Sequence, residues 1–172
     1  MISNYDSTKI RMCGVEPESI VDGPGFRYVI FVQGCPHSCH GCHNPQSHDF
    51  KGGYEISVDD LWRDISKNGN LTGITFSGGE PFCQVAPLLE ISYRAKSIGL
   101  NLMSYSGWTY DELLEKKDPI IDEFLNNLDI LVDGRYIESL RNLELKYRGS
   151  ENQRVIDMNE TRMSGTVKLY CP

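Results

Sequence analysis

Short apolar runs alternate with helical patterns along most of the chain, and this alternation is the strongest constraint on its fold. The runs are rich in β-branched and aromatic residues, so they predict strands. The predicted strands are 27–33, 73–76, 100–104 and 129–132, with a further candidate at 167–170. Strands joined through helices pair in parallel. The sequence therefore predicts an α/β fold with a mainly parallel sheet.

The predicted helices are recognisable by their ends and by their apolar faces. Ser57 is a favourable N-cap for the first of them. The second spans Val85 to Ile98, and Gly99 lies just past its C-terminus. Its predicted inner face consists of Leu88, Ile91, Ala95 and Ile98. Two shorter helices are predicted at 111–117 and 120–126.

Length and charge narrow the classes of function. The 172 residues contain no linker or composition shift, so we expect a single domain over 1–172. The net charge is −7 and basic residues do not cluster, which argues against nucleic acid or an anionic membrane as a partner. No signal peptide or transmembrane run is present in the sequence. We therefore expect a cytoplasmic protein whose six cysteines stay reduced.

Three of the cysteines lie within eight residues, directly after the strand 27–33. Cys35, Cys39 and Cys42 have the spacing C-x3-C-x2-C. Thiolates favour zinc or iron–sulfur clusters over hard cations. Closed structural sites use four protein ligands, so three leave one coordination position open to a ligand that is not protein. We therefore favour an iron–sulfur cluster with one reactive iron.

Two other interpretations of this loop remain open. All histidines of the chain lie in or beside it, namely His37, His40, His43 and His48. One of them could complete a structural zinc site, although zinc ligands usually come in two separated pairs. A simple electron carrier would need a fourth cysteine such as Cys83. We expect Cys13, Cys83 and Cys171 to be free thiols, and His37, His40 and His48 to be polar loop residues.

A second motif, Ser77-Gly78-Gly79-Glu80-Pro81, follows the strand 73–76. On its own it could be a simple turn between a strand and a helix. The carboxyl ends of parallel strands meet at one edge of a sheet, where such folds place their chemistry. We therefore expect this motif and the cysteines to share one site.

Together the two motifs resemble those of the radical S-adenosylmethionine (SAM) enzymes. This family carries Cys-x3-Cys-x2-Cys after the first strand of an open (βα) barrel and Gly-Gly-Glu-Pro after the second. The resemblance implies a small open partial barrel. It also implies that Cys35, Cys39 and Cys42 bind three irons of one 4Fe-4S cluster, while SAM chelates the fourth. Reductive cleavage of SAM would then yield a 5′-deoxyadenosyl radical.

The resemblance also assigns the residues that contact SAM. The backbone against the adenine would come from Gly41, Cys42 and His43. Gly78 and Gly79 lack a Cβ and would let the main chain approach the methionine amino group. Glu80 would accept from that ammonium group, directly or through the backbone that it holds. Many members have an aromatic residue at the position of Gly41, so this chain departs from the family there.

Within this family the chain resembles the short activases of glycyl-radical enzymes. The shared segments are 23–25, 130–134 and 148–150. The resemblance implies an oxidoreductase that generates a glycyl radical on the large subunit of an anaerobic ribonucleoside-triphosphate reductase, with reduced flavodoxin as electron donor. The alternatives are an activase of another glycyl-radical enzyme, such as pyruvate formate-lyase, and a zinc-binding structural module.

Several further residues are left with two possible roles. Arg27 and Asp133 are placed at strand ends on the predicted active face, or in structural ion pairs. Trp108 could border the nucleoside pocket. The candidates for docking a partner or for contacting SAM are Arg148, Asn152 and Arg154. The alternative for each is a place in a solvated polar loop.

Overall fold

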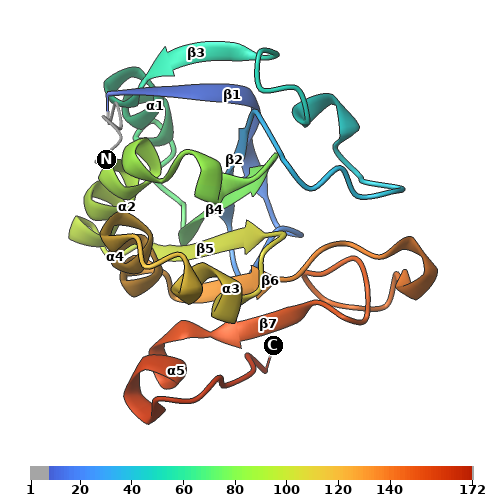
Figure 1. The fold of residues 1–172 in the computed structure, drawn as a ribbon. Helices are drawn as coiled ribbons and strands as arrows, with labels where there is room; N and C mark the ends of the chain where they lie inside the picture. Colours follow the sequence, from blue (N-terminus) through green and yellow to red (C-terminus); the bar gives the residue numbers. More distant parts are fainter. Residues whose placement is uncertain (1–7, 172) are drawn as a thin grey trace.

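The computed structural model describes residues 8–171, which are arranged around a seven-stranded sheet (Figure 1). Its strands are β1 (Lys9–Ser19), β2 (Arg27–Val32), β3 (Tyr54–Ser57), β4 (Gly73–Gly78), β5 (Asn101–Ser106), β6 (Ile130–Asp133) and β7 (Arg154–Asp157). Their order across the sheet is β3-β1-β2-β4-β5-β6-β7. The neighbours β2, β4, β5 and β6 run parallel, whereas β1, β3 and β7 pair antiparallel.

The predicted fold class is confirmed. Each of the four strands predicted in the middle of the chain corresponds to one parallel strand, β2, β4, β5 or β6. The sheet ends at β3 on one side and at β7 on the other, so it is open rather than a closed barrel. The prediction of a closing strand at 167–170 is wrong, because this segment makes only a single bridge, between Leu169 and Ile156. The strand at that edge is β7.

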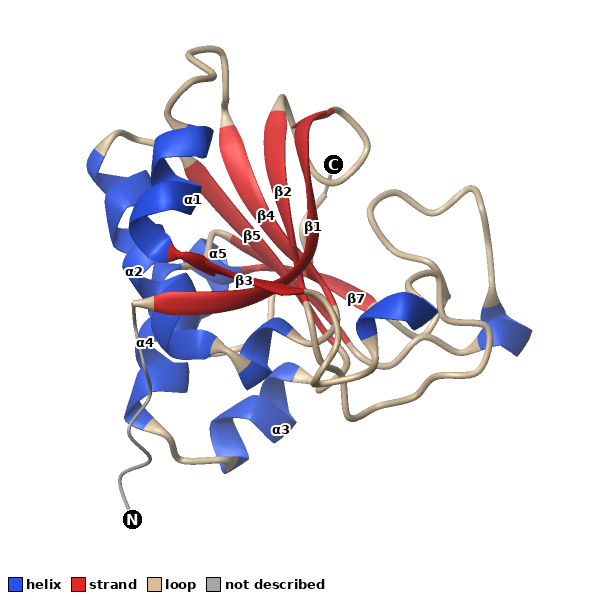
Figure 2. Ribbon diagram, turned by 90° about the horizontal axis from the view of Figure 1, so that it is seen from above, coloured by secondary structure: helices blue, strands red, loops and turns tan. Residues whose placement is uncertain are grey.

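The helices cover one side of the sheet (Figure 2). They are α1 (Val58–Ile65), α2 (Val85–Ser97), α3 (Tyr110–Glu115), α4 (Pro119–Asn127) and α5 (Met158–Ser164). Ser57 caps α1 as predicted, because its side chain accepts from the backbone of Asp60. The prediction that Ile98 lies on the inner face of α2 is wrong. The helix ends at Ser97 and the chain turns at Gly99, which leaves Ile98 63% exposed.

Two apolar clusters hold the sheet from opposite sides. The larger one packs β2 and β4 against the helices, with fully buried side chains such as Phe76, Leu88 and Phe124. The smaller one, on the other side, contains Met103 and Val132. Neighbouring residues of β5 enter different clusters because side chains alternate across a strand. The parallel strands are therefore covered on both faces, which explains their continuous apolar sequences.

The amino end of β2 is closed by Arg27, which corrects the placement of this residue on the active face. The strand runs from Arg27 towards the cysteines, so Arg27 lies at the opposite edge of the sheet. Its side chain is fully buried and donates to Thr75 Oγ1, to Asn101 and to the carbonyls of Pro24 and Ile74. Arg27 is therefore structural.

Two long segments extend from the carboxyl edge of the sheet and run side by side (Figures 1 and 2). One, residues 34–50 after β2, is called here the cysteine loop. The other, residues 134–153 between β6 and β7, is called the β6–β7 connection. They touch where His40 Nδ1 lies 2.6 Å from Glu138 Oε2. Within residues 8–171, no helix has the length and apolarity needed to span a bilayer.

Candidate functional site

A cavity of about 720 Å³ opens at the carboxyl edge of the parallel strands. Its volume falls within the roughly 300–1,000 Å³ that small-molecule sites occupy. One wall is the cysteine loop, another is the turn after β4, and a third is the β6–β7 connection. The predicted site residues that line the cavity are Cys35, Cys39, Cys42, His43, Gly78, Gly79 and Glu80. The structure therefore brings the two sequence motifs to one cavity.

Gly41 is placed differently from the other predicted residues. It is not among those that line the cavity. It faces the β6–β7 connection, where a Cβ on Gly41 would lie 2.7 Å from Glu138 Oε1. Its φ of 71° is a further reason for glycine at this position. A role for Gly41 in contacting adenine stays a prediction.

The cysteine loop is held at its root by hydrogen bonds within the chain. The amide of Gly34 donates to Ser47 O at 2.8 Å, and the amide of Cys35 donates to His48 O at 3.1 Å. The buried amide group of Gln33 donates to Gln46 O and Asp49 O. Both ends of the loop are therefore fixed to the end of β2.

The three thiols of the loop are unpaired and half-buried. Burial raises the pKa of the Cys35 and Cys39 thiols. The thiol of Cys42 accepts from the amide of Asn44 at 3.4 Å. Among residues 8–171, no three Cys, His, Asp or Glu side chains gather closely enough to hold a single metal ion. In an iron–sulfur cluster each cysteine binds a different iron, so three thiols along one cavity wall are a suitable donor set.

The Gly-Gly-Glu-Pro turn lies directly against the root of the cysteine loop. A Cβ on Gly78 would lie 2.5 Å from Val32 N, and one on Gly79 would lie 2.4 Å from Gly34 O. The amide of Glu80 donates to Gly34 O at 2.8 Å. Neither glycine can be replaced without displacing backbone, so the two motifs are packed as one unit.

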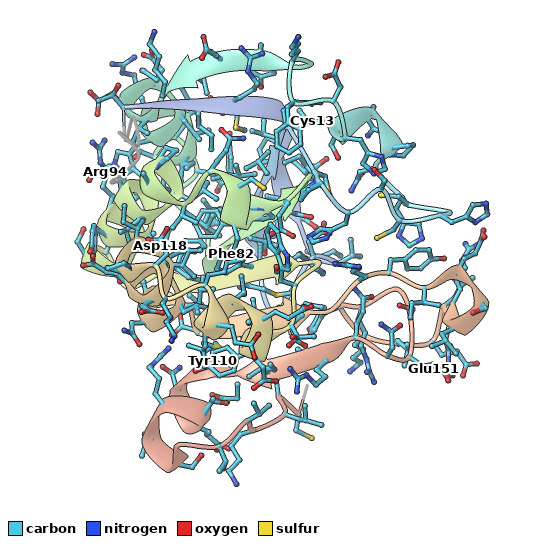
Figure 3. The ribbon with its side chains drawn as sticks, viewed as in Figure 1. Cys13, Phe82, Arg94, Tyr110, Asp118 and Glu151 are labelled. Atoms are coloured by element: carbon cyan, nitrogen blue, oxygen red, sulfur yellow. The ribbon has the colours of Figure 1, made fainter. Side chains whose placement is uncertain are left out.

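Glu80 is buried at this junction, with 1% of its side chain exposed. Its Oε2 accepts from Gly107 N at 2.7 Å and lies 2.8 Å from His37 Nε2. Its Oε1 accepts from Phe82 N at 3.0 Å, which caps the short 3-10 helix Pro81–Cys83. Phe82 itself points into the core, with its ring 5.4 Å from that of Phe124 (Figure 3). The carboxylate of Glu80 therefore already has three partners within the chain.

The sequence analysis missed the importance of His37. It was expected to be a polar loop residue, but its side chain is only 4% exposed and pairs with Glu80. Its ring packs edge-on against Trp108, with centroids 4.5 Å apart. Trp108 is not among the residues that line the cavity, and Lys116 lies over its ring. The only sequence signal for this role was the position of His37 between two candidate iron ligands, Cys35 and Cys39.

The candidates in the β6–β7 connection and in β7 have partners of their own. Arg154 pairs with the buried Asp133 at 2.5 Å, so the ion-pair alternative for Asp133 is the one observed. Arg148 lines the cavity while donating to Gln153 O. Asn152 donates to Arg135 O at 2.8 Å. These contacts fold the connection into a stable wall.

This wall meets the cysteine loop through aromatic rings. The rings of His43 and Tyr136 lie 4.9 Å apart, and both line the cavity. A Cβ on Gly149 would lie 3.1 Å from the His43 ring. The side of the cavity near Cys42 is therefore closed by residues from both segments.

Cys83 lies behind the site rather than in it. It ends the 3-10 helix after Pro81 and is not among the residues that line the cavity. Burial, together with the charges of Glu80 and Cys35, raises the pKa of its thiol to about 12. Such a thiol stays protonated and unreactive at neutral pH.

Comparison with known sequences identifies relatives of this chain. Residues 21–156 match the family of the 4Fe-4S single cluster domain. The anaerobic ribonucleoside-triphosphate reductase-activating protein of Escherichia coli K12 is 32% identical over 145 residues, which cover 80% of this chain and 92% of that protein. The protein of the same name from Vibrio cholerae is 30% identical, with 80% and 91% covered.

Two further similarities are to proteins of other names. The pyruvate formate-lyase-activating enzyme of Listeria monocytogenes is 35% identical over 156 residues, which cover 86% of this chain but 61% of that enzyme. Among solved structures, QueE from Escherichia coli is 18% identical with a TM-score of 0.45, over 59% of this chain and 53% of that one.

Proposed function

The chain belongs to the 4Fe-4S single cluster domain family and to the family of anaerobic ribonucleoside-triphosphate reductase-activating proteins, and on this basis we propose that it is the radical SAM activase of such a reductase. The observation that carries the proposal is the single cavity in which three thiols face the Gly-Gly-Glu-Pro turn. An iron–sulfur cluster and SAM are the cofactors that this family membership supports.

We propose Cys35, Cys39 and Cys42 as the three protein ligands of one 4Fe-4S cluster per chain. Their support is their shared cavity wall and the fixed root of the loop that carries them. Cys83 is not proposed as a fourth ligand, because it does not line the cavity and the pKa of its thiol is raised to about 12. The fourth iron is then left for SAM.

The residues around the cavity would bind and orient SAM. Bound together, the cluster and SAM supply a one-electron reductive cleavage that generates a hydrogen-abstracting radical. The backbone of Cys42 and His43 would lie against the adenine, on the side closed by Tyr136. The amide hydrogens of Gly79 and Glu80 are already donated to carbonyl groups of the chain. An ammonium group needs acceptors, so this turn would bind it through its oxygen atoms.

The reductase would present its glycine at the mouth of this cavity. Val21 and Leu143 both line the cavity although they are 73% and 82% exposed. Exposed apolar side chains beside a polar site are typical of surfaces that bind a protein partner. We further propose that the partner is the large subunit of the reductase, that reduced flavodoxin supplies the electron, and that the protein works in the cytoplasm.

The segments 23–25, 130–134 and 148–150, which resemble those of the reductase activases, lead us to favour the reductase as the substrate protein. The Listeria monocytogenes pyruvate formate-lyase-activating enzyme, 35% identical over 86% of this chain, keeps a formate-lyase as the alternative.

The test uses protein reconstituted without oxygen. We expect about four irons and four sulfides per chain, and formation of methionine and 5′-deoxyadenosine when the protein is reduced with SAM. Mixing it with the large reductase subunit should then give a glycyl-type doublet in the electron paramagnetic resonance spectrum. A protein without sulfide would overturn the enzyme assignment. A doublet obtained only with a pyruvate formate-lyase would move the substrate to the alternative.

A further inference from the structure

A buried junction joins the three loops that follow the central strands. His37 belongs to the cysteine loop after β2, Glu80 to the turn after β4, and Gly107 to the end of β5. Glu80 Oε2 is the shared acceptor, 2.8 Å from His37 Nε2 and 2.7 Å from Gly107 N. A carboxylate can only accept, so Nε2 of His37 carries the hydrogen.

Burial makes this contact compulsory. The side chains of His37 and Glu80 are 4% and 1% exposed although both residues line the cavity, so water competes weakly for either side chain. A buried carboxylate that loses a donor is strongly destabilised. Glu80 therefore holds the ring of His37 wherever the turn after β4 is folded.

The packing around the ring fixes its orientation as well. A Cβ on Gly107 would lie 2.3 Å from Cδ2 of His37, so the ring occupies the space that a side chain at this position would fill. The edge-on contact with Trp108 bounds the ring on another side. The ring is therefore confined by β5 and bonded by the turn after β4.

His37 lies midway between Cys35 and Cys39, whereas the backbone bonds of Gly34 and Cys35 act at the root of the loop. Resting on the function proposed above, we infer that His37 is a positioning residue that acts through Glu80. It fixes the thiols of the cysteine loop relative to the Gly78-Gly79 backbone, so that SAM can contact the cluster and the turn together. On this inference Glu80, which also lines the cavity, serves the junction rather than the ammonium group of SAM.

The same loop supplies a matched control. His40 pairs with Glu138 at 2.6 Å, but its side chain is 92% exposed and that of Glu138 is 49% exposed. Water can replace either partner there, so this contact contributes little. The two His–Glu pairs therefore differ in burial while sharing residue type and loop.

The experiment compares His37→Leu, His37→Gln and His40→Leu with the wild type, all reconstituted without oxygen. Iron and sulfide contents are measured first. SAM binding is then titrated on the unreduced protein, which does not cleave SAM, through the change that SAM causes in the visible absorption spectrum of the cluster. For His37→Leu we expect the SAM dissociation constant to rise roughly tenfold or more, the scale of effects from residues that orient metal ligands. His40→Leu should stay within about twofold of the wild type.

His37→Gln should restore SAM binding to near the wild-type value, because its amide nitrogen can replace Nε2 as the donor to Glu80. This variant decides the matter if His37→Leu holds no cluster. Loss of SAM binding in His37→Gln equal to that in His37→Leu would overturn the inference. Wild-type binding in His37→Leu would also overturn it.

A double-variant cycle tests the role of Glu80. If His37 and Glu80 act as a unit, Glu80→Gln should weaken SAM binding no further in the His37→Leu background. An additional loss of the same size in that background would indicate direct contact between Glu80 and SAM. A wild-type protein that holds no cluster overturns the proposed function and the inference together. A functional wild type with unaffected variants overturns the inference alone.

Discussion

The two ends of the central strands use buried polar groups in opposite ways. At the amino end of β2, the guanidinium of Arg27 donates all its hydrogens to the chain itself. At the carboxyl end, thiols and glycines surround an open cavity of about 720 Å³. The Arg27 guanidinium contributes stability and has no hydrogen left to donate to a ligand. The second end keeps its thiols available at the cavity, while the side chains of the His37–Glu80 junction there are nearly as buried as Arg27.

The largest effect expected at the carboxyl end comes from Cys39→Ala. This change removes one of the three proposed iron ligands, so reductive SAM cleavage should be abolished. Iron analysis and detection of 5′-deoxyadenosine check this. The thermal midpoint of the protein prepared without metal should stay close to that of the wild type, because Cys39 is only half-buried. Retained reductive cleavage in Cys39→Ala would refute the ligand assignment.

At the amino end, Arg27→Leu should lower stability and leave iron binding unchanged, which is the reverse of the effect expected for Cys39→Ala. The change leaves Asn101 Oδ1, Thr75 and several carbonyls without a donor, which costs about 3–5 kcal/mol of unfolding free energy. Urea unfolding measures the loss. The fraction that remains folded should still bind iron as the wild type does. A variant of unchanged stability that fails to bind iron would contradict the separation between the two ends.

Gly79→Ala should affect stability and ligand binding together, because Gly79 packs the turn against the cysteine loop. Its Cβ would lie 2.4 Å from Gly34 O, which must move. We expect a loss of about 1–3 kcal/mol in unfolding free energy, the usual range for overpacking, accompanied by weaker SAM binding. Denaturant unfolding and spectral titration with SAM measure the two effects. Wild-type values for both would show that this packing is not needed.

The smallest effect is expected from Cys83→Ala. Cys83 is half-buried and does not line the cavity, so the change leaves a small void and removes no proposed ligand. Iron content and SAM cleavage should match the wild type, while stability falls by about 1 kcal/mol. Loss of the cluster in this variant would instead support an electron carrier with four cysteine ligands.

Much of the fold follows from the sequence because β2 and β4 are covered on both faces and read as continuous apolar runs. β1 was not predicted, because Gly14, Pro17 and charged residues interrupt its pattern. β7 has only two apolar residues, Val155 and Ile156, between charged ones, so it does not stand out as an apolar run. The edge strands therefore depend on pairing partners that a local pattern does not reveal.

The same limit applies to the site. The two motifs could be placed together because each follows a parallel strand, and parallel strands end at one edge. The contact between His37 and Glu80 joins residues 43 positions apart and leaves no periodic trace. Arg27 was put on the wrong edge because a charged residue beside a strand does not show which end of the sheet it faces. Contacts between loops had to come from the structure.

Because the sheet is open, it affects how a large substrate can reach the site. Because β3 and β7 do not pair with each other, the wall of strands stops on either side of the thiols. An internal bend of a folded protein can thus be laid in sideways, with no need to thread a free end. Size alone then sets no upper limit on the molecule that this small chain can act upon.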